Sequence, residues 1–475
     1  MSEPRDKSDG ETEKRPPYGQ YQLDLYAQAM ISGKKPIITT DPNKLEQAAK
    51  DVMTPEAFNY VFGGAGEQAT MHANRLAFRQ WKLIPRMLRP TMPRDLSVKL
   101  FGKSYETPIL MAPVGVQGAY HADGENGVAT ACASLGVPFI YSTAATVPLE
   151  EVAAAADLSV GISPPSSSSR PPTPSGETPG PATGTASAPA PTSVPIPKAP
   201  RWFQLYWPLD DGITASLLSR ARVAGCDVLV VTLDTFTMSW RPLDLDNGYL
   251  PFALGEGNAL GFSDPVFRRR FAAHLASEGQ GDGENGNEEP DQDTAVEDNV
   301  IAASRFWLGE VFSGYAHRWE DLATLRRFWG QDRPIVLKGV LSVQDAEMAV
   351  RAGMDGIIVS NHGGRQLDGA VPSLEMLPEI VDAVGDRLTV MFDSGIRTGA
   401  DVLKALALGA KAVLVGRPVI YGLGAAGTEG ARHVLAGLLA DVDQSMGLAG
   451  VQNVSELNRS ILRKINYGGD VKSSL

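Results

Sequence analysis

The stretch IIVSNHGGR at residues 357–365 carries the pattern that decides the fold: a short apolar, β-branched run ends in polar residues and glycines. Seven more apolar runs of this kind occur, at residues 109–112, 139–142, 202–206, 228–232, 335–338, 389–393 and 412–416. Continuous rather than alternating apolarity indicates strands that are buried on both faces, as in a parallel sheet.

Helical patterns separate these strands, for example at residues 210–224, 343–352 and 399–408. Eight strand–helix units predict an α/β protein with a closed (β/α)8 TIM barrel, and an open doubly wound sheet is the alternative. We expect a polar, disordered N-terminus at 1–17, an N-terminal helical cap at 18–104, the barrel at 105–457 and a C-terminal tail at 458–475. Within the cap, helices are expected at 42–51 and 55–62.

Two inserts interrupt the predicted barrel. Residues 163–200 include 12 prolines among 38 residues, and residues 277–299 hold nine acidic side chains with no lysine or arginine. Neither composition buries enough apolar surface to offset the entropy of ordering, so both are predicted to be disordered, solvated segments. The acidic insert supplies most of the net charge of −12, and the remainder of the chain carries −3.

The composition of the 475 residues excludes several classes of protein. A net charge of −12 argues against a nucleic-acid or anionic-membrane partner, and no run approaches the roughly 20 apolar residues of a membrane span. The two cysteines build no disulfide framework, and no cluster has metal-ligand spacing. We therefore expect a cytoplasmic protein; the alternative is peroxisomal, because Ser473-Ser474-Leu475 is similar to a C-terminal peroxisomal address.

Polar side chains stand where the predicted strands end. Active sites of (β/α)8 barrels form at the carboxyl ends of their strands. Each such residue alone has an ordinary structural explanation, such as a cap or a salt bridge at the rim, but together they indicate a site. The set comprises Ser142, Gln204, Tyr206, Thr232, Asp234, Lys338, Ser360, His362, Asp393 and Arg417.

The last two strands predict a phosphate site. Glycines and arginines follow both strands, at residues 393–397 and 416–417, where barrels often bind phosphate through main-chain N–H groups and guanidinium forks. His362 is a candidate general base, since imidazole titrates near neutral pH and Asp234 could stabilise its charged form. Arg241 and Arg365 could together clamp a substrate carboxylate.

The run SNHGGRQLD at residues 360–368 resembles the signature of the FMN-dependent α-hydroxy-acid oxidases and dehydrogenases. The resemblance extends from residue 18 to residue 457, apart from the inserts. Residues 203–206, 232–235, 240–245 and 392–401 are most similar to the lactate 2-monooxygenase branch of that family. The resemblance implies bound FMN, oxidation of a lactate-like L-2-hydroxy acid by oxygen, and a homo-oligomer.

The resemblance also implies a role for each matching residue. His362, Asp234 and Tyr206 would be catalytic, and the substrate would contact Tyr60, Tyr206, Arg241, His362 and Arg365. FMN would be held by Pro113, Val114, Gly115, Ser142, Gln204, Tyr206, Thr232, Lys338, Ser360, Asp393, Ser394, Gly395, Ile396, Arg397, Gly416 and Arg417.

Two positions depart from the commonest family pattern. Gly115 stands where many members have alanine, which predicts extra room beside the flavin. Ala144 stands where glycolate oxidases have a large aromatic residue, which predicts room for a bulkier substrate. The expected reaction is oxidative decarboxylation of the lactate 2-monooxygenase type. The alternatives are a simple oxidase that releases the 2-oxo acid and peroxide, a dehydrogenase that uses another acceptor, and, from another class, an FMN barrel isomerase.

Overall fold

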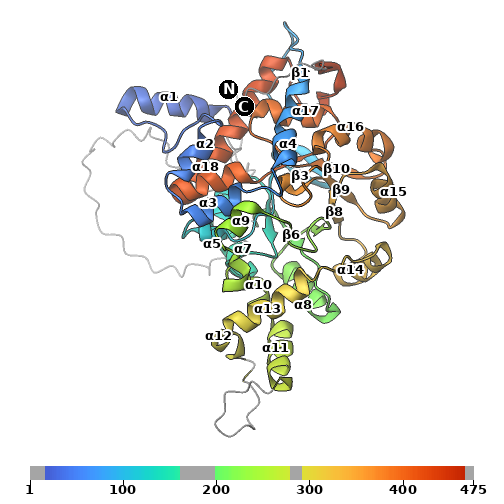
Figure 1. Ribbon diagram of the computed structural model, residues 1–475. Coiled ribbons are helices and arrows are strands. Elements are labelled where there is room, and N and C mark those ends of the chain that lie inside the picture. Colours follow the sequence, from blue (N-terminus) through green and yellow to red (C-terminus); the bar gives the residue numbers. More distant parts are fainter. Residues whose placement is uncertain (1–16, 161–197, 279–290, 292, 466–475) are drawn as a thin grey trace, which may run out of the picture.

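Eight parallel strands close into a barrel at the centre of the molecule (Figure 1). The computed structural model describes residues 17–160, 198–278, 291 and 293–465. The strands run around the barrel in the order β10-β11-β4-β5-β6-β7-β8-β9. Their bounds are β4 Ile109–Met111, β5 Phe139–Ser142, β6 Arg201–Leu205, β7 Leu229–Thr232, β8 Ile335–Val340, β9 Gly356–Val359, β10 Thr389–Phe392 and β11 Val413–Val415. The predicted TIM barrel is confirmed, and the open sheet is wrong.

Helices surround the barrel, and three of the outer ones, α8, α15 and α17, begin at side-chain caps that the sequence encodes. Ser342 accepts a hydrogen bond from the Asp345 N–H, and Thr398 and Asp401 form a reciprocal capping box. Such caps satisfy N–H groups that have no partner within the helix. The outer helices are α6 Gly124–Leu135, α7 Leu149–Leu158, α8 Asp211–Val223, α14 Leu322–Trp329, α15 Val343–Arg351, α16 Ser373–Val384, α17 Gly399–Ala407 and α18 Arg417–Ala449.

A β-hairpin plugs the amino-terminal end of the barrel. Strands β2 Val98–Leu100 and β3 Lys103–Tyr105 pair in antiparallel fashion. Leu100 and Tyr105 pack in the same buried cluster as interior residues of the barrel, and the Tyr105 hydroxyl accepts a 3.1 Å hydrogen bond from Trp202 Nε1. The predicted N-terminal helices are present, and the hairpin is an addition to them that the sequence did not reveal, because each of its strands is too short to show a period.

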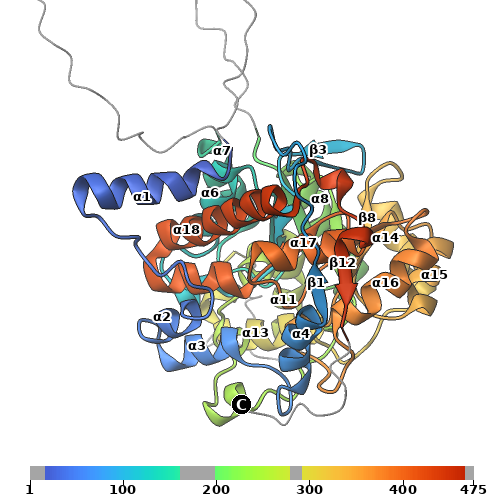
Figure 2. The same cartoon turned by 90° about the horizontal axis from the view of Figure 1, so that it is seen from above.

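The N-terminal segment covers the outside and the carboxyl-terminal mouth of the barrel. Helices α1 Gln20–Ser32, α2 Leu45–Lys50, α3 Pro55–Phe62 and α4 Ala69–Gln80 lead into strand β1 Trp81–Leu83. Strand β1 pairs with β12 Leu462–Lys464, as Figure 2 shows, so the expected C-terminal tail belongs to the folded body as far as residue 464. In the described ranges, no helix is both long and apolar enough to cross a membrane.

The ends of both predicted inserts belong to the folded body, which corrects their boundaries. Most of the proline-rich insert (161–197) lies outside the described residues, but the Ala199 N–H donates to Asp157 Oδ1 at 2.8 Å. Of the acidic insert, residues 279–290 and 292 lie outside the described residues. The flanking residues form the end of α11 Pro265–Ser277 and helix α12 Ala295–Asp298, which buries Ala295 and Val296. Residues 1–16 and 466–475 also lie outside the described residues.

Strand β7 is followed by the longest excursion between a strand and its outer helix. It contains α9 Pro242–Asp246, η1 Pro251–Leu254, α10 Ala259–Phe262, α11, α12 and α13 Val300–Val311 before α14 resumes the barrel pattern. In Figure 1 the green and yellow helices of this excursion extend away from the barrel, with α11 and α12 farthest out. Its first turns carry Arg241 to the mouth of the barrel.

Candidate active site

A cavity of about 990 Å³ opens at the carboxyl ends of the strands. This volume includes space that is open to solvent. Loops that follow seven of the strands contribute to its wall, the eighth strand β8 supplies Lys338, and α3 supplies Tyr60. The predicted site residues that line it are Tyr60, Pro113, Val114, Gly115, Tyr206, Arg241, Lys338, His362, Arg365, Asp393, Ser394, Gly395, Ile396, Arg397, Gly416 and Arg417.

The other predicted site residues do not line this cavity directly. Ser142 donates a 3.1 Å hydrogen bond to Gln204 Oε1, and both side chains are buried. Ser360 Oγ accepts a hydrogen bond of 3.1 Å from Lys338. Thr232 and Asp234 line a neighbouring cavity. Asp234 nevertheless reaches the site through His362.

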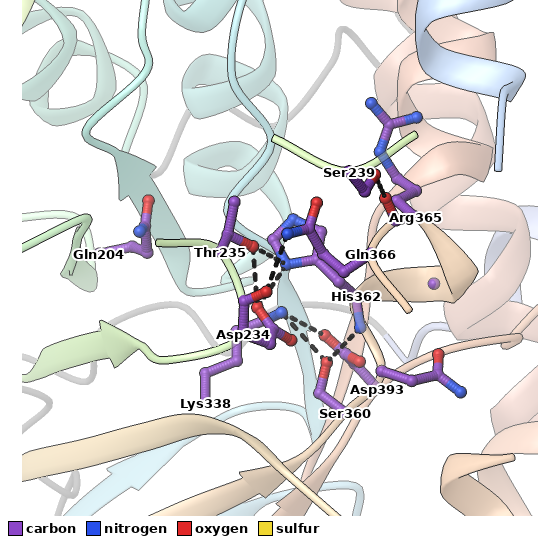
Figure 3. Close-up of polar contacts among 12 residues, drawn as sticks. Gln204, Asp234, Thr235, Ser239, Lys338, Ser360, His362, Arg365, Gln366 and Asp393 are labelled. Atoms are coloured by element: carbon purple, nitrogen blue, oxygen red, sulfur yellow. Dashed lines mark hydrogen bonds and ion pairs between the residues drawn. The ribbon is translucent and has the colours of Figure 1, made fainter. Parts of the chain in front are cut away.

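His362 and Asp234 form a hydrogen-bonded pair, drawn in Figure 3. The His362 Nδ1 lies 2.7 Å from Asp234 Oδ1 and 3.0 Å from Thr235 Oγ1. Burial lowers the pKa of His362 although Asp234 opposes this effect. Burial alone would raise the pKa of Asp234, but the charges of His362 and Lys338 lower it to about 2. At neutral pH the imidazole is therefore neutral beside a carboxylate, which holds the proton on Nδ1 and leaves Nε2 free to accept one.

Two guanidinium groups lie on one side of the cavity. Arg241, only 5% exposed, donates to the main-chain oxygen of Arg365 at 3.0 Å. Arg365 donates to the main-chain oxygen of Tyr60 at 2.6 Å, and its guanidinium lies 5.3 Å from the centre of the Tyr60 ring. Burial, and next the charge of Arg365, lower the pKa of Arg241. A buried and a half-buried cation beside each other create a site that favours an anion.

Lys338 projects from β8 into the floor of the cavity. Its side chain is buried, and its Nζ lies 3.4 Å from Asp393 Oδ2, in addition to the hydrogen bond with Ser360 (Figure 3). Burial would lower the pKa of this ammonium group, but the carboxylates of Asp393 and Asp234 more than offset it and raise the pKa. Lys338 therefore keeps its positive charge in the interior.

A third group of cations lies at the end of the cavity formed by β10 and β11. Arg417 donates to the main-chain oxygens of Val61 and Gly363 at 3.0 and 2.9 Å. Burial, together with the charge of Arg365, lowers the pKa of Arg417 to about 9. Gly395 has φ +100°, and a Cβ atom there would lie 3.1 Å from the Asn74 main-chain oxygen. The glycine thus allows a tight turn beside buried positive charge, which suits a phosphate group.

The structure adds an apolar wall that the sequence did not reveal. The rings of Tyr206 and Phe312 lie 5.0 Å apart, and those of Phe312 and Phe252 lie 5.3 Å apart. Met238 and Tyr120 also line this part of the cavity. Phe252 and Phe312 come from the excursion after β7, where no periodic pattern marks which side chains turn inward.

Two polar residues were missed although they lie inside recognised motifs. Gln366 accepts a 2.6 Å hydrogen bond from Arg241 and donates one of 2.9 Å to the main-chain oxygen of Asp234. Thr235 shares Nδ1 of His362 with Asp234. Gln366 directly follows Arg365, and Thr235 directly follows Asp234. This adjacency to predicted site residues was the sign in the sequence that could have identified them.

The expected room beside Gly115 is not there. A Cβ atom at this position would lie 2.6 Å from Ala144 Cβ and 2.7 Å from the Ala144 main-chain oxygen. The Val116 N–H donates to that same oxygen at 2.8 Å, which holds the two loops together. The space left by the missing methyl group at 115 is thus filled by the neighbouring loop, and the expectation drawn from Gly115 is wrong.

Comparison with known proteins identifies the family. The model of the FMN-dependent dehydrogenase family matches residues 49–168 and 183–464. An FMN-dependent alpha-hydroxy acid dehydrogenase of Penicillium citrinum is 48% identical over 458 residues, which cover 96% of this chain and 99% of that protein. A protein of the same description from Schizosaccharomyces pombe is 44% identical over 451 residues, covering 94% and 96%.

A solved structure agrees with these relatives. Mandelate oxidase with (S)-4-hydroxymandelic acid is 37% identical, covers 90% of this chain with 98% of its own, and has a TM-score of 0.67. The fold and the site define a flavin-dependent barrel oxidoreductase. The chain belongs to the FMN-dependent α-hydroxy-acid dehydrogenase and oxidase family.

The described residues fit FMN. Gln204 Nε2 and Thr232 Oγ1 are buried polar atoms without a hydrogen-bond partner in the described part of the chain. Such atoms need a partner, and the polar edge of a flavin ring supplies donors and acceptors. At the other end of the cavity, Arg397 and Arg417 are half-buried cations, and no carboxylate of the described ranges forms an ion pair with their side chains. A phosphate would compensate their charge.

Proposed function

We propose that the protein oxidises an L-2-hydroxy acid to the 2-oxo acid level with bound FMN. One observation carries this proposal: His362, which is hydrogen-bonded to Asp234, lines the same cavity as the Arg241–Arg365 pair. A neutral base beside a site for a carboxylate suits removal of a proton from a hydroxy acid. Bound FMN supplies the acceptor for the two electrons of the oxidation.

Side chains of the protein bind the substrate, accept its proton and stabilise the charges that form. The guanidinium groups of Arg241 and Arg365 bind the substrate carboxylate, and Tyr206 contacts its hydroxyl group. His362 accepts a proton at Nε2, and Asp234 stabilises the resulting imidazolium. Lys338 holds a positive charge at the cavity floor, where it would stabilise the negative charge that FMN acquires when it takes up electrons.

The phosphate and the ring of FMN would be held at opposite ends of the cavity. Gly395, Arg397, Gly416 and Arg417 would hold the phosphate, and Asp393 the ribityl chain. Ser142, Gln204 and Thr232 would bind the polar edge of the ring. Pro113, Val114, Gly115, Ser360, Ser394 and Ile396 would complete the pocket.

We further propose oxygen as the electron acceptor and retention of the product for oxidative decarboxylation, as in the lactate 2-monooxygenase branch. The similarity of residues 240–245 to that branch supports this proposal, and so does the pair Arg241 and Arg365, which would hold the carboxylate of the product. Slow release would give peroxide time to attack the bound 2-oxo acid.

The apolar wall favours a second candidate, an oxidase or dehydrogenase for a bulkier hydroxy acid. Phe252, Phe312 and Met238 would surround an aromatic side chain, and Ala144 leaves space that a larger residue would occupy. The similar structure of mandelate oxidase holds an aromatic hydroxy acid. An FMN barrel isomerase is less well supported, because two arginines and a base suit carboxylate oxidation.

Anaerobic flavin reduction tests the main proposal. The purified protein should be yellow, and L-lactate or L-mandelate should bleach it while the D-isomers should not. The acid that reduces the flavin faster shows whether the apolar wall accommodates the methyl group of lactate or the phenyl group of mandelate. A colourless protein that cannot be reconstituted with FMN would contradict the proposal.

Product analysis under air distinguishes oxidative decarboxylation from a simple oxidase and from a dehydrogenase. Acetate formed from lactate with little peroxide supports decarboxylation, whereas stoichiometric pyruvate and peroxide indicate a simple oxidase. Negligible oxygen uptake with rapid reduction of a quinone or a cytochrome would instead indicate a dehydrogenase.

A further inference from the structure

The backbone at His362 is held in an unfavourable conformation. His362 has φ +57°, and Gly363 and Gly364 follow with φ +66° and +76°. The left-handed region is unfavourable for a residue with a Cβ atom. The surrounding structure must therefore fix this turn if the imidazole is to keep one position.

Three side chains fix the turn through its N–H groups. Ser360 Oγ accepts from His362 N–H at 3.1 Å, and Ser394 Oγ accepts from Gly363 N–H at 3.0 Å. The third is Asn361, whose Oδ1 accepts from Gly364 N–H at 3.1 Å. Asn361 directly precedes His362, and its side chain binds Gly364, which follows on the other side of His362. The orientation of the Asn361 amide therefore determines where the imidazole lies.

Asn74 of α4 sets the orientation of the Asn361 amide. The two amides form a reciprocal pair, in which each Nδ2 donates to the Oδ1 of the other at 2.8 Å. Asn74 is 2% exposed and Asn361 is 5% exposed, so water does not compete. Asn74 Oδ1 also accepts from Ser373 N–H at 3.3 Å. This second donor identifies the oxygen of the Asn74 amide and so fixes its orientation toward Asn361.

We propose that Asn74 is a positioning residue for the base His362 and acts on it through Asn361. This inference rests on the proposed function, in which His362 accepts the proton of the substrate. Asn74 lies on α4 of the N-terminal segment, 287 residues before Asn361 in the chain. The N-terminal segment would therefore take part in catalysis by positioning the base. The role requires one donor and one acceptor on Asn74, both directed at Asn361.

The substitution Asn74→Asp tests this requirement within one variant. A protonated carboxyl group has the size of the amide and supplies the same donor and acceptor. An ionised carboxylate has no donor and faces the Oδ1 acceptor of Asn361. Burial raises the pKa of such a carboxyl group above its usual value near 4.

We expect the rate of anaerobic flavin reduction in the variant to approach that of the wild type at acidic pH. It should fall about 10-fold or more below the wild type as the introduced carboxyl group ionises, because a small displacement of a catalytic group costs that much. Asn453→Asp, in a capping box outside the cavity, is the control and should keep the wild-type profile. FMN content and thermal stability are measured at each pH.

Two results would overturn the inference. One is a profile of Asn74→Asp that runs parallel to the wild type at every pH. The other is a loss of rate that only follows loss of FMN or unfolding, because that pattern indicates a structural role.

A second measurement does not depend on turnover. Nitrogen-15 labelling of the six histidines allows the imidazole of His362 to be followed by NMR, with His362→Gln used for assignment. In Asn74→Asp the His362 signal should show a second titration step while the other five histidines do not. An unchanged His362 signal would overturn the inference, whereas a wild-type protein that oxidises no hydroxy acid would overturn only the proposed function.

Discussion

A single imidazole sits between the carboxylate of Asp234 and the cavity, so its removal should affect chemistry more than binding. We expect His362→Ala to retain FMN and to reduce the rate constant of anaerobic flavin reduction about 100-fold or more, the usual contribution of a general base. Stopped-flow absorbance measures this rate constant. His274→Ala, on the outer helix α11, is the control and should behave as the wild type.

The pH dependence of reduction follows from the lowered pKa of His362. The active form is the neutral imidazole, so the rate should fall as the pH drops through that pKa, which lies below the usual 6.5. Asp234→Asn removes the carboxylate that raises this pKa, so its acidic limb should move to still lower pH and its maximal rate should decrease. A wild-type midpoint above 6.5, or an unshifted midpoint in Asp234→Asn, would contradict the assignment of His362 as the base.

Residues at strand ends were predictable, and residues that support them were not. Asp393 directly follows β10, His362 comes three residues after the end of β9, and Lys338 lies in the second half of β8, so all three stand close to buried apolar runs that are visible in the sequence. Asn74 lies on an outer helix and reaches the site through a contact between residues 287 positions apart. No local pattern encodes such a contact, because it depends on how α4 packs against the completed barrel.

Helix α6 joins two loops of the cavity through one buried carboxylate. Glu125 is 0% exposed and accepts from the N–H groups of Gln117 and Thr146 at 3.0 Å each and from the Thr146 hydroxyl at 2.5 Å. These loops carry Gly115 and Ala144 into the cavity wall. The carboxylate thus fixes the relative position of two segments that face the cofactor.

We expect Glu125→Gln to weaken FMN binding several-fold and to lower thermal stability, because an amide cannot accept from all three donors and each buried unpaired group costs about 1–3 kcal/mol. Asp443→Asn is the matched control. Asp443 is another buried carboxylate, and it accepts from Gly19 N–H and Arg94 away from the cavity. The control should lose stability but keep the FMN affinity, which fluorescence titration measures. Equal loss of FMN affinity in both variants would mean that Glu125 acts only through global stability.

Strands and outer helices were predictable as elements because their apolar runs are continuous and their caps are local. The hairpin β2–β3 and the course of the excursion after β7 were not predictable, each for its own reason. Each strand of the hairpin has three residues, too few to show a period. The excursion is held by aromatic contacts such as that between Phe252 and Phe312, and such contacts are set by tertiary packing.

The two faces of the whole barrel should tolerate change very differently. The proline-rich insert connects the end of α7 to the start of β6, so it enters at the amino-terminal face, whereas the cavity lies at the carboxyl ends. Replacing residues 163–197 with a short glycine–serine linker should leave the turnover number unchanged. The replacement must stop before Ala199, whose N–H binds Asp157. A large loss of turnover at unchanged stability would show that the insert acts on the site.

Strands β1 and β12 join residues 81–83 to residues 462–464. During synthesis the C-terminal partner leaves the ribosome last, so β1 lacks its partner until almost the whole described chain has been made. Helix α4, which leads directly into β1, carries Asn74 toward the turn of His362. A nascent chain that stops short of β12 therefore lacks one of the contacts that secure this helix at its C-terminal end, where Lys404 and Glu375 supply others. The last strand of the described chain thus helps to hold the helix that carries Asn74, although it lies far from the cavity in the sequence.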